Sequence, residues 1–134
     1  MGEVPRDQGP PGGLRLPPSR RITRAREIQA LLRSGKRKKT SHLDVFFLSS
    51  RRLGPRIGLV VPKHGRRVVD RNLLKRRVRE VLRREVLPRL WRAEVPLDVL
   101  ARARKVAYRT TYQQLRKELI KATEEICSGK PSLR

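Results

Sequence analysis

At residues 68–87 the chain reads VVDRNLLKRRVREVLRREVL. An α-helix turns by about 100° per residue, so the large apolar residues of this stretch fall on one side. They are Leu74, Val78, Val81 and Leu82. Polar and basic residues fall on a neighbouring side, here called the basic stripe: Arg71, Asn72, Lys75, Arg76, Arg79 and Arg83. The pattern predicts a helix from Val68 to Leu87, ended by Pro88, that packs on a sheet and presents the basic stripe to solvent.

The positive charges of the basic stripe repel one another along the helix. Like charges four residues apart destabilise an isolated helix by a few tenths of a kcal/mol per pair. Glu80 and Glu85 can neutralise only part of this charge, so the helix is suited to a phosphate backbone. Asn72 is the neutral member, and its amide can both donate to and accept from a ribose hydroxyl or a base edge. Its alternative role is local, as a cap or backbone partner near the start of the helix.

The composition of the whole chain points to a polyanionic partner. Lys and Arg number 35 against 12 Asp and Glu, which gives a formal net charge of +23. A solvated surface does not require this excess, and arginine grips phosphate through two nitrogen atoms at once. Nucleic acid is the first candidate partner and an anionic membrane the second. No apolar run approaches the roughly 20 residues of a membrane-spanning helix, which disfavours the membrane.

The chain has 134 residues, enough for one domain. Residues 1–18 are rich in proline and glycine and predict a disordered basic tail, and residues 128–134 predict a second disordered end. The domain is therefore expected to span residues 19–127. The first residues lack the apolar segment of a secretory signal, and Cys127, the only cysteine, cannot form an internal disulfide. Both observations favour a cytoplasmic protein.

Around the long helix the pattern predicts an α+β fold, a two-layer α/β sandwich with helices packed on a sheet. Ser19 is a suitable N-cap for a first helix, which Gly35 ends, and the basic residues 36–39 then form a loop. The remaining expected elements are strands at His42–Ser50, Arg56–Val61 and Leu97–Arg102 and a last helix at Thr110–Ile126. The order is helix, strand, strand, helix, strand, helix, and one further strand is allowed before the long helix.

Phe46 and Phe47 lie next to each other in the first expected strand. Neighbouring side chains in a strand point to opposite faces of the sheet, so one of the two rings belongs to the core. The other ring could stack on a nucleobase, an interaction of about 1–3 kcal/mol. The register of the sheet decides which ring is which, and we expect Phe46 to be the exposed one.

No set of side chains in the sequence is arranged for hydrolysis. Metal-assisted hydrolysis by a protein needs clustered carboxylates or histidines. The acids Asp44, Asp70 and Asp98 belong to three different elements. Neither His42 nor His64 has another His or Cys at ligand spacing, and we interpret both as surface residues. We therefore expect no catalytic residue and no metal site in the protein.

The run from Val69 to Glu80 resembles the signature of the bacterial ribonuclease P protein subunit, which has Arg-Asn, an aliphatic residue, Lys-Arg and then Arg-Glu. Other segments resemble the family in the same order: Arg20–Ile22 with Gly35, Arg56–Lys63, Leu97–Arg102 and Tyr112–Leu119. The resemblance covers roughly residues 19–126. A short Arg-Asn match is a weak signal, whereas this ordered set at the right spacing is a strong one.

The resemblance implies a fold and a set of binding sites. The fold would be that of the ribonuclease P protein and of the second domain of ribosomal protein S5, with four strands and a left-handed β-α-β crossover. About 98% of such crossovers are right-handed. The basic stripe would bind the large catalytic RNA. A cleft between the first helix and the sheet would bind the 5′ leader of precursor tRNA, through Arg21, Phe46, Lys63 and Arg102.

The resemblance also implies how the chemistry is divided. In the family, RNA and its Mg²⁺ ions hydrolyse the phosphodiester bond in the 5′ maturation of tRNA. The protein would thus assist an endonuclease without catalytic residues, and the Mg²⁺ would be held by the RNA. We expect a cytoplasmic monomer that binds the catalytic RNA and precursor tRNA, with neither DNA nor a membrane as partner.

The chain departs from the family pattern at three places. Leu73 stands where the family usually has Arg, Ile28 where it has Phe, and Pro62–Gly65 where it has a loop of the Ser-Lys-Lys-Val-Gly type. Leu73 lies about 100° from Asn72 on the helical wheel, outside the basic stripe, so we expect a modest loss of binding. Ile28 cannot stack on a base as an aromatic ring does, so aromatic stacking would fall to the strand.

Two other functions fit the composition. A small basic ribosomal protein would bind ribosomal RNA as a structural component, and composition alone does not separate it from the first function. An intrinsic nuclease would need an acidic pair among Asp44, Asp70 and Asp98. The RNA that co-purifies with the chain separates the first two functions, and the third predicts cleavage by the protein alone.

Overall fold

The computed structural model describes residues 20–50 and 54–129. Its strands are β1 (Lys36–Lys39), β2 (Leu43–Ser49), β3 (Arg56–Val60) and β4 (Leu97–Ala103). Its helices are α1 (Ala25–Ser34), α2 (Val68–Val81), α3 (Leu87–Arg92) and α4 (Tyr112–Cys127), with a π-helical turn η3 (Leu82–Val86) and a 3₁₀ helix η4 (Lys105–Arg109). The predicted α+β class is confirmed. The predicted tail at residues 1–18 lies outside the described residues, as does the chain after Gly129.

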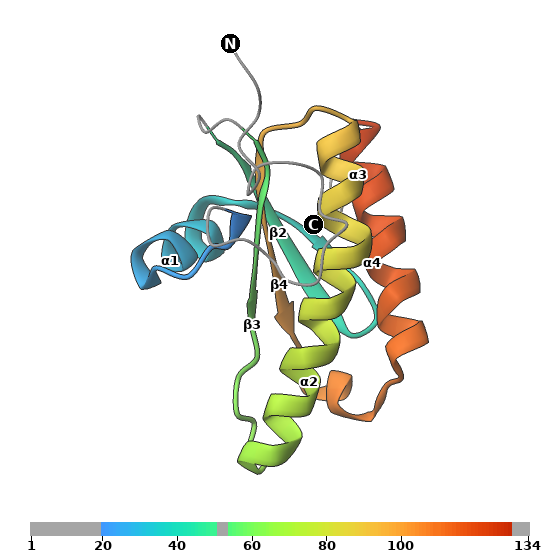
Figure 1. The fold of residues 1–134 in the computed structure, drawn as a ribbon. Coiled ribbons are helices and arrows are strands. Elements are labelled where there is room, and N and C mark those ends of the chain that lie inside the picture. The colour runs from blue at the N-terminus through green and yellow to red at the C-terminus, as the bar shows by residue number, and fades with distance from the viewer. Residues whose placement is uncertain (1–19, 51–53, 130–134) are drawn as a thin grey trace.

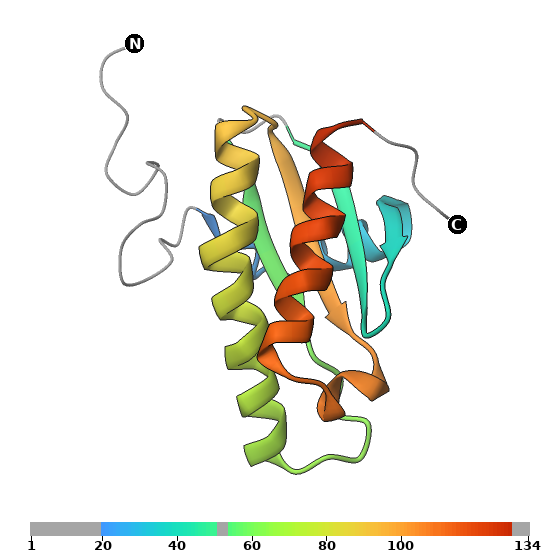
Figure 2. The same ribbon diagram turned by 90° about the vertical axis from the view of Figure 1, so that its right-hand side faces the viewer.

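The four strands form one sheet in the order β1-β2-β4-β3. Strand β2 is antiparallel to β1 and β4, whereas β3 is parallel to β4. Helices α2, α3 and α4 cover one face of the sheet, and α1 lies on the other (Figure 1). Seen from the helix side in Figure 2, β3 and β4 both run downward and β4 lies to the right of β3. The connection through α2 is therefore left-handed, as the resemblance implied.

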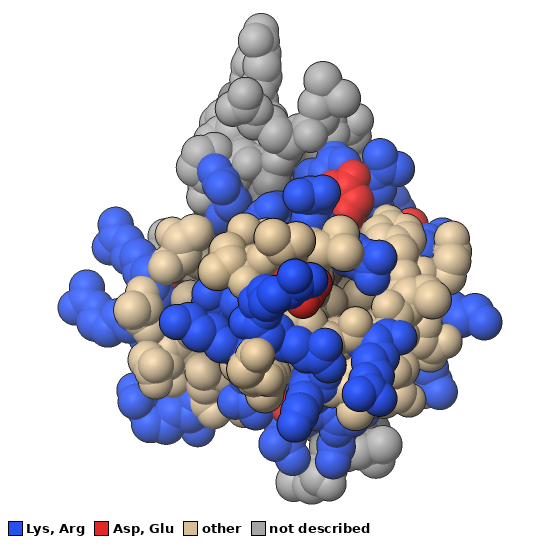
Figure 3. Space-filling view, turned by 90° about the horizontal axis from the view of Figure 1, so that it is seen from below, with Lys and Arg blue, Asp and Glu red and all other residues tan. Residues whose placement is uncertain are grey.

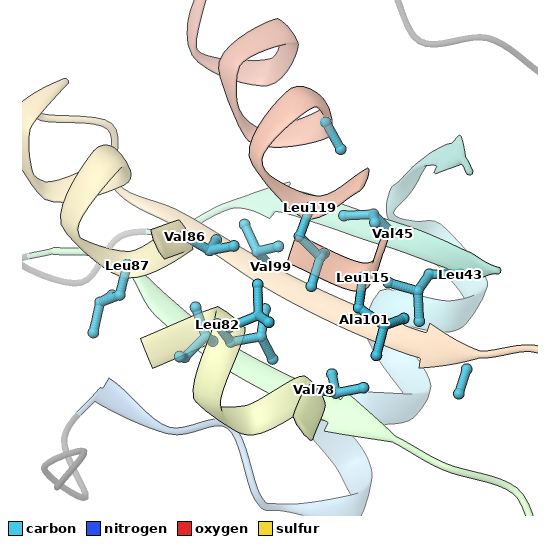
Figure 4. Packing of buried hydrophobic residues seen from close by; sticks show 14 of the residues in the cluster. Leu43, Val45, Val78, Leu82, Val86, Leu87, Val99, Ala101, Leu115 and Leu119 are labelled. Carbon is cyan, nitrogen blue, oxygen red and sulfur yellow. The ribbon is translucent and has the colours of Figure 1, made fainter. Parts of the chain in front are cut away.

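The main core lies between the sheet and helices α2 and α4 (Figure 4). The predicted apolar side of α2 faces this core, because Leu74, Val78, Val81 and Leu82 are each at most 2% exposed. Alternate residues of the strands and the apolar side of α4 complete it: Leu43, Val45, Val99, Ala101, Leu115 and Leu119. The apolar residues that recur at helical spacing in the helices and at every second position in the strands thus form one buried layer.

The long helix does not end at Pro88, contrary to prediction. A π-helical turn follows α2, and in it the Leu87 amide donates to the Leu82 carbonyl, five residues back. Pro88 then occupies the first turn of α3. A proline in a first helical turn needs no N–H partner, and a widened turn relieves the clash of its ring with the preceding turn. The apolar residues of η3 and α3 remain buried, so packing keeps the helix continuous past the proline.

The first helix begins at Ala25 and not at Ser19, which lies outside the described residues. The chain before α1 is extended and runs beside β3. Arg21 forms a parallel bridge with Ile57, and the Ile22 amide donates to the Ile57 carbonyl at 2.8 Å. These bonds engage backbone groups at the open edge of β3, which explains why the helical spacing of the segment is overridden.

Residues 36–39, predicted as a loop, form the edge strand β1. The segment is entirely basic, and charge on an edge strand discourages pairing with another chain. Gly35 makes the tight turn from α1 into this strand. A Cβ at that position would lie 2.6 Å from the Leu31 carbonyl oxygen, so glycine alone fits there.

A polar network ties α4 to the turn between β1 and β2. The Glu118 side chain is 7% exposed and accepts hydrogen bonds from the Thr40 hydroxyl at 2.7 Å and the Gln114 amide at 3.0 Å. The backbone amide and ring of His42 contact the same carboxylate. His42 is therefore half-buried, and its predicted surface position is wrong, whereas His64 is exposed as expected. Burial opposes ionisation of Glu118, but the hydrogen bonds together outweigh it and hold the pKa of the carboxyl below its usual value.

Glu118→Gln is expected to destabilise the fold by about 1–3 kcal/mol near pH 7, because the network loses its charged acceptor. A carboxyl whose pKa is lowered by folding stabilises the protein fully above its unfolded pKa of 4.5, and this stabilisation is lost as the pH falls through the lowered value. Urea unfolding near pH 7 and near pH 3 measures the difference. Glu124→Gln, at a side chain 65% exposed on the same helix, serves as control. A Glu118→Gln effect that does not change with pH would contradict the explanation.

Candidate nucleic-acid interface

Four members of the basic stripe present their polar ends to solvent. Asn72, Arg76 and Arg79 are exposed and Lys75 is half-buried. Within the described residues no hydrogen bond or ion pair engages these four side chains, which we call the free stripe. The departure Leu73 lies beside them and is 40% exposed. The free stripe is fixed in direction because the opposite side of α2 is buried in the core.

The two ends of the basic stripe are engaged by the protein itself. Arg71 Nε donates to the Val61 carbonyl at 2.9 Å and so joins α2 to the end of β3. Arg83, with 11% of its side chain exposed, donates to Glu80 at 2.6 Å. Hydrogen bonds from Arg83 and Arg84, opposed by burial, hold the pKa of the Glu80 carboxyl below its usual value. The predicted RNA contacts of Arg71 and Arg83 stay predictions, and both would have to exchange or share an existing bond.

The face of the sheet that carries α1 holds part of the second predicted set. Phe46 and Arg102 lie on neighbouring strands, and the Arg102 guanidinium lies 5.0 Å from the centre of the Phe46 ring. Arg102 also donates to Asp44 at 3.2 Å. The expected exposure of Phe46 is wrong, because the residue is 5% exposed and packs with Leu31 and Leu100 beneath α1. The Phe46 ring thus belongs to the small buried cluster under α1 and not to the surface.

Phe47 points to the other face and packs, half-buried, against the main core. Neither phenylalanine therefore offers an open ring to a base. Arg102 lies over the Phe46 ring and has 34% of its side chain exposed. A guanidinium plane can itself stack on a base. Where we expected an exposed aromatic ring, the surface therefore presents the Arg102 guanidinium.

Arg21 lies near the free stripe. Together with Lys75 and Arg79 it lines a hollow of about 260 Å³ at the β3 edge. Ile28, which stands where the family has phenylalanine, forms part of the apolar wall of this hollow. Lys63 is exposed in the loop after β3. Arg21, which we expected in the leader cleft, thus lies beside the free stripe of α2.

Strand β1 adds two cations that are not among the predicted site residues. Arg37 lies opposite Phe46 and Lys39 lies opposite Asp44, and residues directly opposite each other share a face of the sheet. Both cations are exposed on the face that carries α1. An all-basic segment lacks the alternation of apolar and polar residues that identifies a strand, so no sequence signal placed them there.

The aspartates of the described chain are dispersed and paired. No group of three or more His, Cys, Asp or Glu in residues 20–50 and 54–129 is placed to hold a metal ion. Each of three aspartates forms an ion pair with an arginine: Asp44 with Arg102, Asp70 with Arg67 and Asp98 with Arg56. Asp44 and Asp98 are separated by about 13 Å along the strands, too far to act on one ion. This arrangement gives no support to an intrinsic nuclease.

Positive charge dominates the end of the molecule at which α2 begins. Lys and Arg side chains spread over this surface, and Asp and Glu appear at only a few points (Figure 3). Such a field attracts a polyanion from many directions, and the free stripe gives it a defined contact. In the part of the chain that the structure describes, no helix is long and apolar enough to cross a membrane.

Comparison with known protein sequences identifies relatives over most of this chain. The Ribonuclease P family model matches residues 16–127. The ribonuclease P protein component of Syntrophobacter fumaroxidans is 32% identical over 112 residues, which covers 81% of this chain and 89% of the relative. That of Thermus scotoductus is 36% identical over 94 residues, which covers 70% of this chain and 52% of the relative.

Solved structures with the same fold include two ribonuclease P proteins. The protein of Thermotoga maritima aligns with a TM-score of 0.65 at 25% identity, over 78% of this chain and 96% of that one. The protein of Staphylococcus aureus aligns with a TM-score of 0.64 at 22% identity, over 80% of this chain and 94% of that one, and this likeness shows the fold alone. Because the family model spans nearly the whole described chain and the fold agrees, this chain belongs to the ribonuclease P protein component family.

Proposed function

We propose that this chain binds the catalytic RNA of ribonuclease P through the free stripe and thereby assists the endonucleolytic 5′ maturation of tRNA. The observation that carries this proposal is the set of polar ends on one face of α2 that the protein leaves unengaged. Their mutual repulsion is relieved when RNA phosphates lie against them and counterions are released. Among them Asn72 supplies a donor and an acceptor for a ribose hydroxyl or a base edge.

The 5′ leader of precursor tRNA is proposed to bind on the face of the sheet beside α1. A single strand of RNA is held by cations along its backbone and by flat groups on which its bases stack. Arg37, Lys39 and Arg102 supply exposed positive charge on this face, and Arg102 also presents a guanidinium plane. The hollow beside Arg21 and Ile28 continues this surface toward the free stripe.

In this proposal the protein contributes binding, and the RNA with its Mg²⁺ ions contributes the hydrolysis. The pairing of Asp44, Asp70 and Asp98 with arginines supports this division, because these carboxylates already have partners. The protein acts in the cytoplasm as a monomer within the ribonucleoprotein. Its partners are the catalytic RNA and precursor tRNA.

Identification of the RNA that co-purifies with the full chain tests the proposed partner. Sequencing of RNA recovered after a wash near 0.15 M salt is expected to return mainly the ribonuclease P RNA. The variant Arg76→Gln/Arg79→Gln should lose most of that RNA, because two phosphate contacts are removed. Recovery of mainly ribosomal RNA would contradict the proposal and favour a ribosomal protein.

A further inference from the structure

A groove lined by lysines lies on the far side of the molecule from α2. It lies between the edge strand β1 and helix α4 and has a volume of about 690 Å³. Strands β1 and β3 are the two edges of the sheet. Figure 2 shows α2 and α4 side by side, with α2 on the side of β3 and α4 on the side of β2. The groove and the free stripe are thus at opposite sides of the fold.

The α4 wall of this β1–α4 groove presents two exposed cations, Lys117 and Lys121. Residues four apart on a helix are neighbours on one face, with Cβ atoms about 5–6 Å apart. The two lysines of α4 therefore form a short row along the groove.

The acids of the groove do not neutralise these lysines. Glu118 is engaged in the buried network with Thr40, His42 and Gln114. Glu125 forms an ion pair with the buried Lys38 at 3.0 Å. Within residues 20–50 and 54–129 no ion pair engages the exposed Lys117 and Lys121. The groove therefore keeps a net positive charge in the folded protein.

From these observations we infer that the β1–α4 groove binds the phosphodiester backbone of a second RNA segment, separate from the segment on the free stripe. A cationic groove that follows a backbone is the usual site for a single strand of nucleic acid. The Ser41 hydroxyl and the Gln114 carbonyl oxygen lie at its walls and can bond 2′-hydroxyls. The inference goes beyond the proposed function, which places RNA on α2 and on the α1 face.

Because the free stripe and the groove are separate, the protein can connect two RNA segments. Neighbouring strands lie about 4.8 Å apart, so the two edges of a four-stranded sheet are about 14 Å apart before side chains and helices are added. An RNA segment that lies along the free stripe leaves the opposite side of the fold open to another segment. The protein would therefore hold together two RNA segments, whether from one molecule or from two.

Binding of a labelled oligouridylate of about 5 nucleotides to the full chain tests the groove. Native mass spectrometry near 0.15 M salt is expected to show three copies bound to the wild type, on the free stripe, the α1 face and the groove, and two copies bound to Lys117→Gln/Lys121→Gln. The variant Arg76→Gln/Arg79→Gln should also bind two copies, on the α1 face and in the groove. The control Arg84→Gln/Arg92→Gln removes the same charge from exposed positions outside these surfaces and should still bind three.

The salt dependence of binding adds a second readout. Each single-strand phosphate contact contributes about 0.7 to the slope of log affinity against log salt, so the groove variant should lose about 1.4 from the summed slope. Gln keeps the helix propensity close to that of Lys, and unchanged melting by circular dichroism confirms that α4 is intact.

Several results would overturn the groove assignment. Two bound copies on both the wild type and Lys117→Gln/Lys121→Gln, with one on Arg76→Gln/Arg79→Gln, would leave the proposed function standing and remove the groove site. Equal weakening of the groove variant and the control would show undirected charge attraction. Displacement of the groove-bound copy by polyglutamate of matched charge would assign the groove to an acidic protein. Loss of binding in the groove variant alone would support the groove and contradict the proposed role of α2.

Discussion

The variant Lys75→Gln/Arg76→Gln/Arg79→Gln is expected to bind the catalytic RNA about 100-fold more weakly than the wild type near 0.15 M salt. Each lost phosphate contact removes about 0.7–0.9 from the slope of log affinity against log salt. The three side chains have no partner within the described protein, so their removal costs binding and leaves the core of α2 intact. Electrophoretic mobility shifts over a range of salt concentrations measure both the affinity and the slope.

Two further variants separate directed contacts from general charge. Arg84→Gln/Arg92→Gln removes two exposed charges outside the free stripe and should weaken binding only a few-fold. Asn72→Ala should lower the affinity without changing the salt slope, because the lost group is neutral. If each removed charge weakened binding equally wherever it lay, the free stripe would have no special role.

Arg56→Met is expected to destabilise the protein by about 3–5 kcal/mol, because it removes a buried guanidinium and leaves the half-buried Asp98 carboxylate without its ion-pair partner. Arg56 is 7% exposed and donates to Asp98 on β4 at 2.8 Å and to Glu27 on α1 at 3.2 Å. The bond to Asp98, more than the bond to Glu27, raises the pKa of Arg56 against the effect of burial. Urea unfolding near pH 7 measures the loss. The same residue fastens α1 to the sheet beside the proposed leader surface.

Neutralising the partners provides the matched control. Arg56→Met/Asp98→Asn/Glu27→Gln carries no uncompensated carboxylate at this place and should recover much of the stability lost by Arg56→Met alone. A single variant as stable as the wild type, or a triple variant worse than the single one, would show that the ion pairs do not hold α1 on the sheet.

The helical period of residues 68–82 was enough to predict both sides of α2. The apolar residues Leu74 and Val78 recur at helical spacing and are buried, and Arg76 and Arg79 on the neighbouring side are exposed. Local spacing predicts such features because burial of one side determines the direction of the other. The left-handed crossover came only from the resemblance, since the general rule for such connections predicts the opposite hand.

Features that depend on distant parts of the chain were missed. His42 contacts Glu118 across 76 residues of sequence, and no local pattern links the two. Strand β1 exists because β2 pairs with it, although its own residues carry no alternation. The burial of Phe46 depends on the position of α1, which begins later than the N-cap signal suggested. Arg83 forms an ion pair with Glu80, whereas the helical wheel indicated only that Glu80 neutralises part of the charge of the basic stripe.

Cleavage of precursor tRNA by the reconstituted ribonucleoprotein tests the central claim most directly. The purified chain alone is expected to leave precursor tRNA intact. Added to the catalytic RNA at a low Mg²⁺ concentration at which that RNA is nearly inactive, it is expected to restore 5′ cleavage, and the variant Lys75→Gln/Arg76→Gln/Arg79→Gln should require far more protein for the same rate. Cleavage by the protein without RNA, or full activity of this variant at wild-type protein concentrations, would contradict the account.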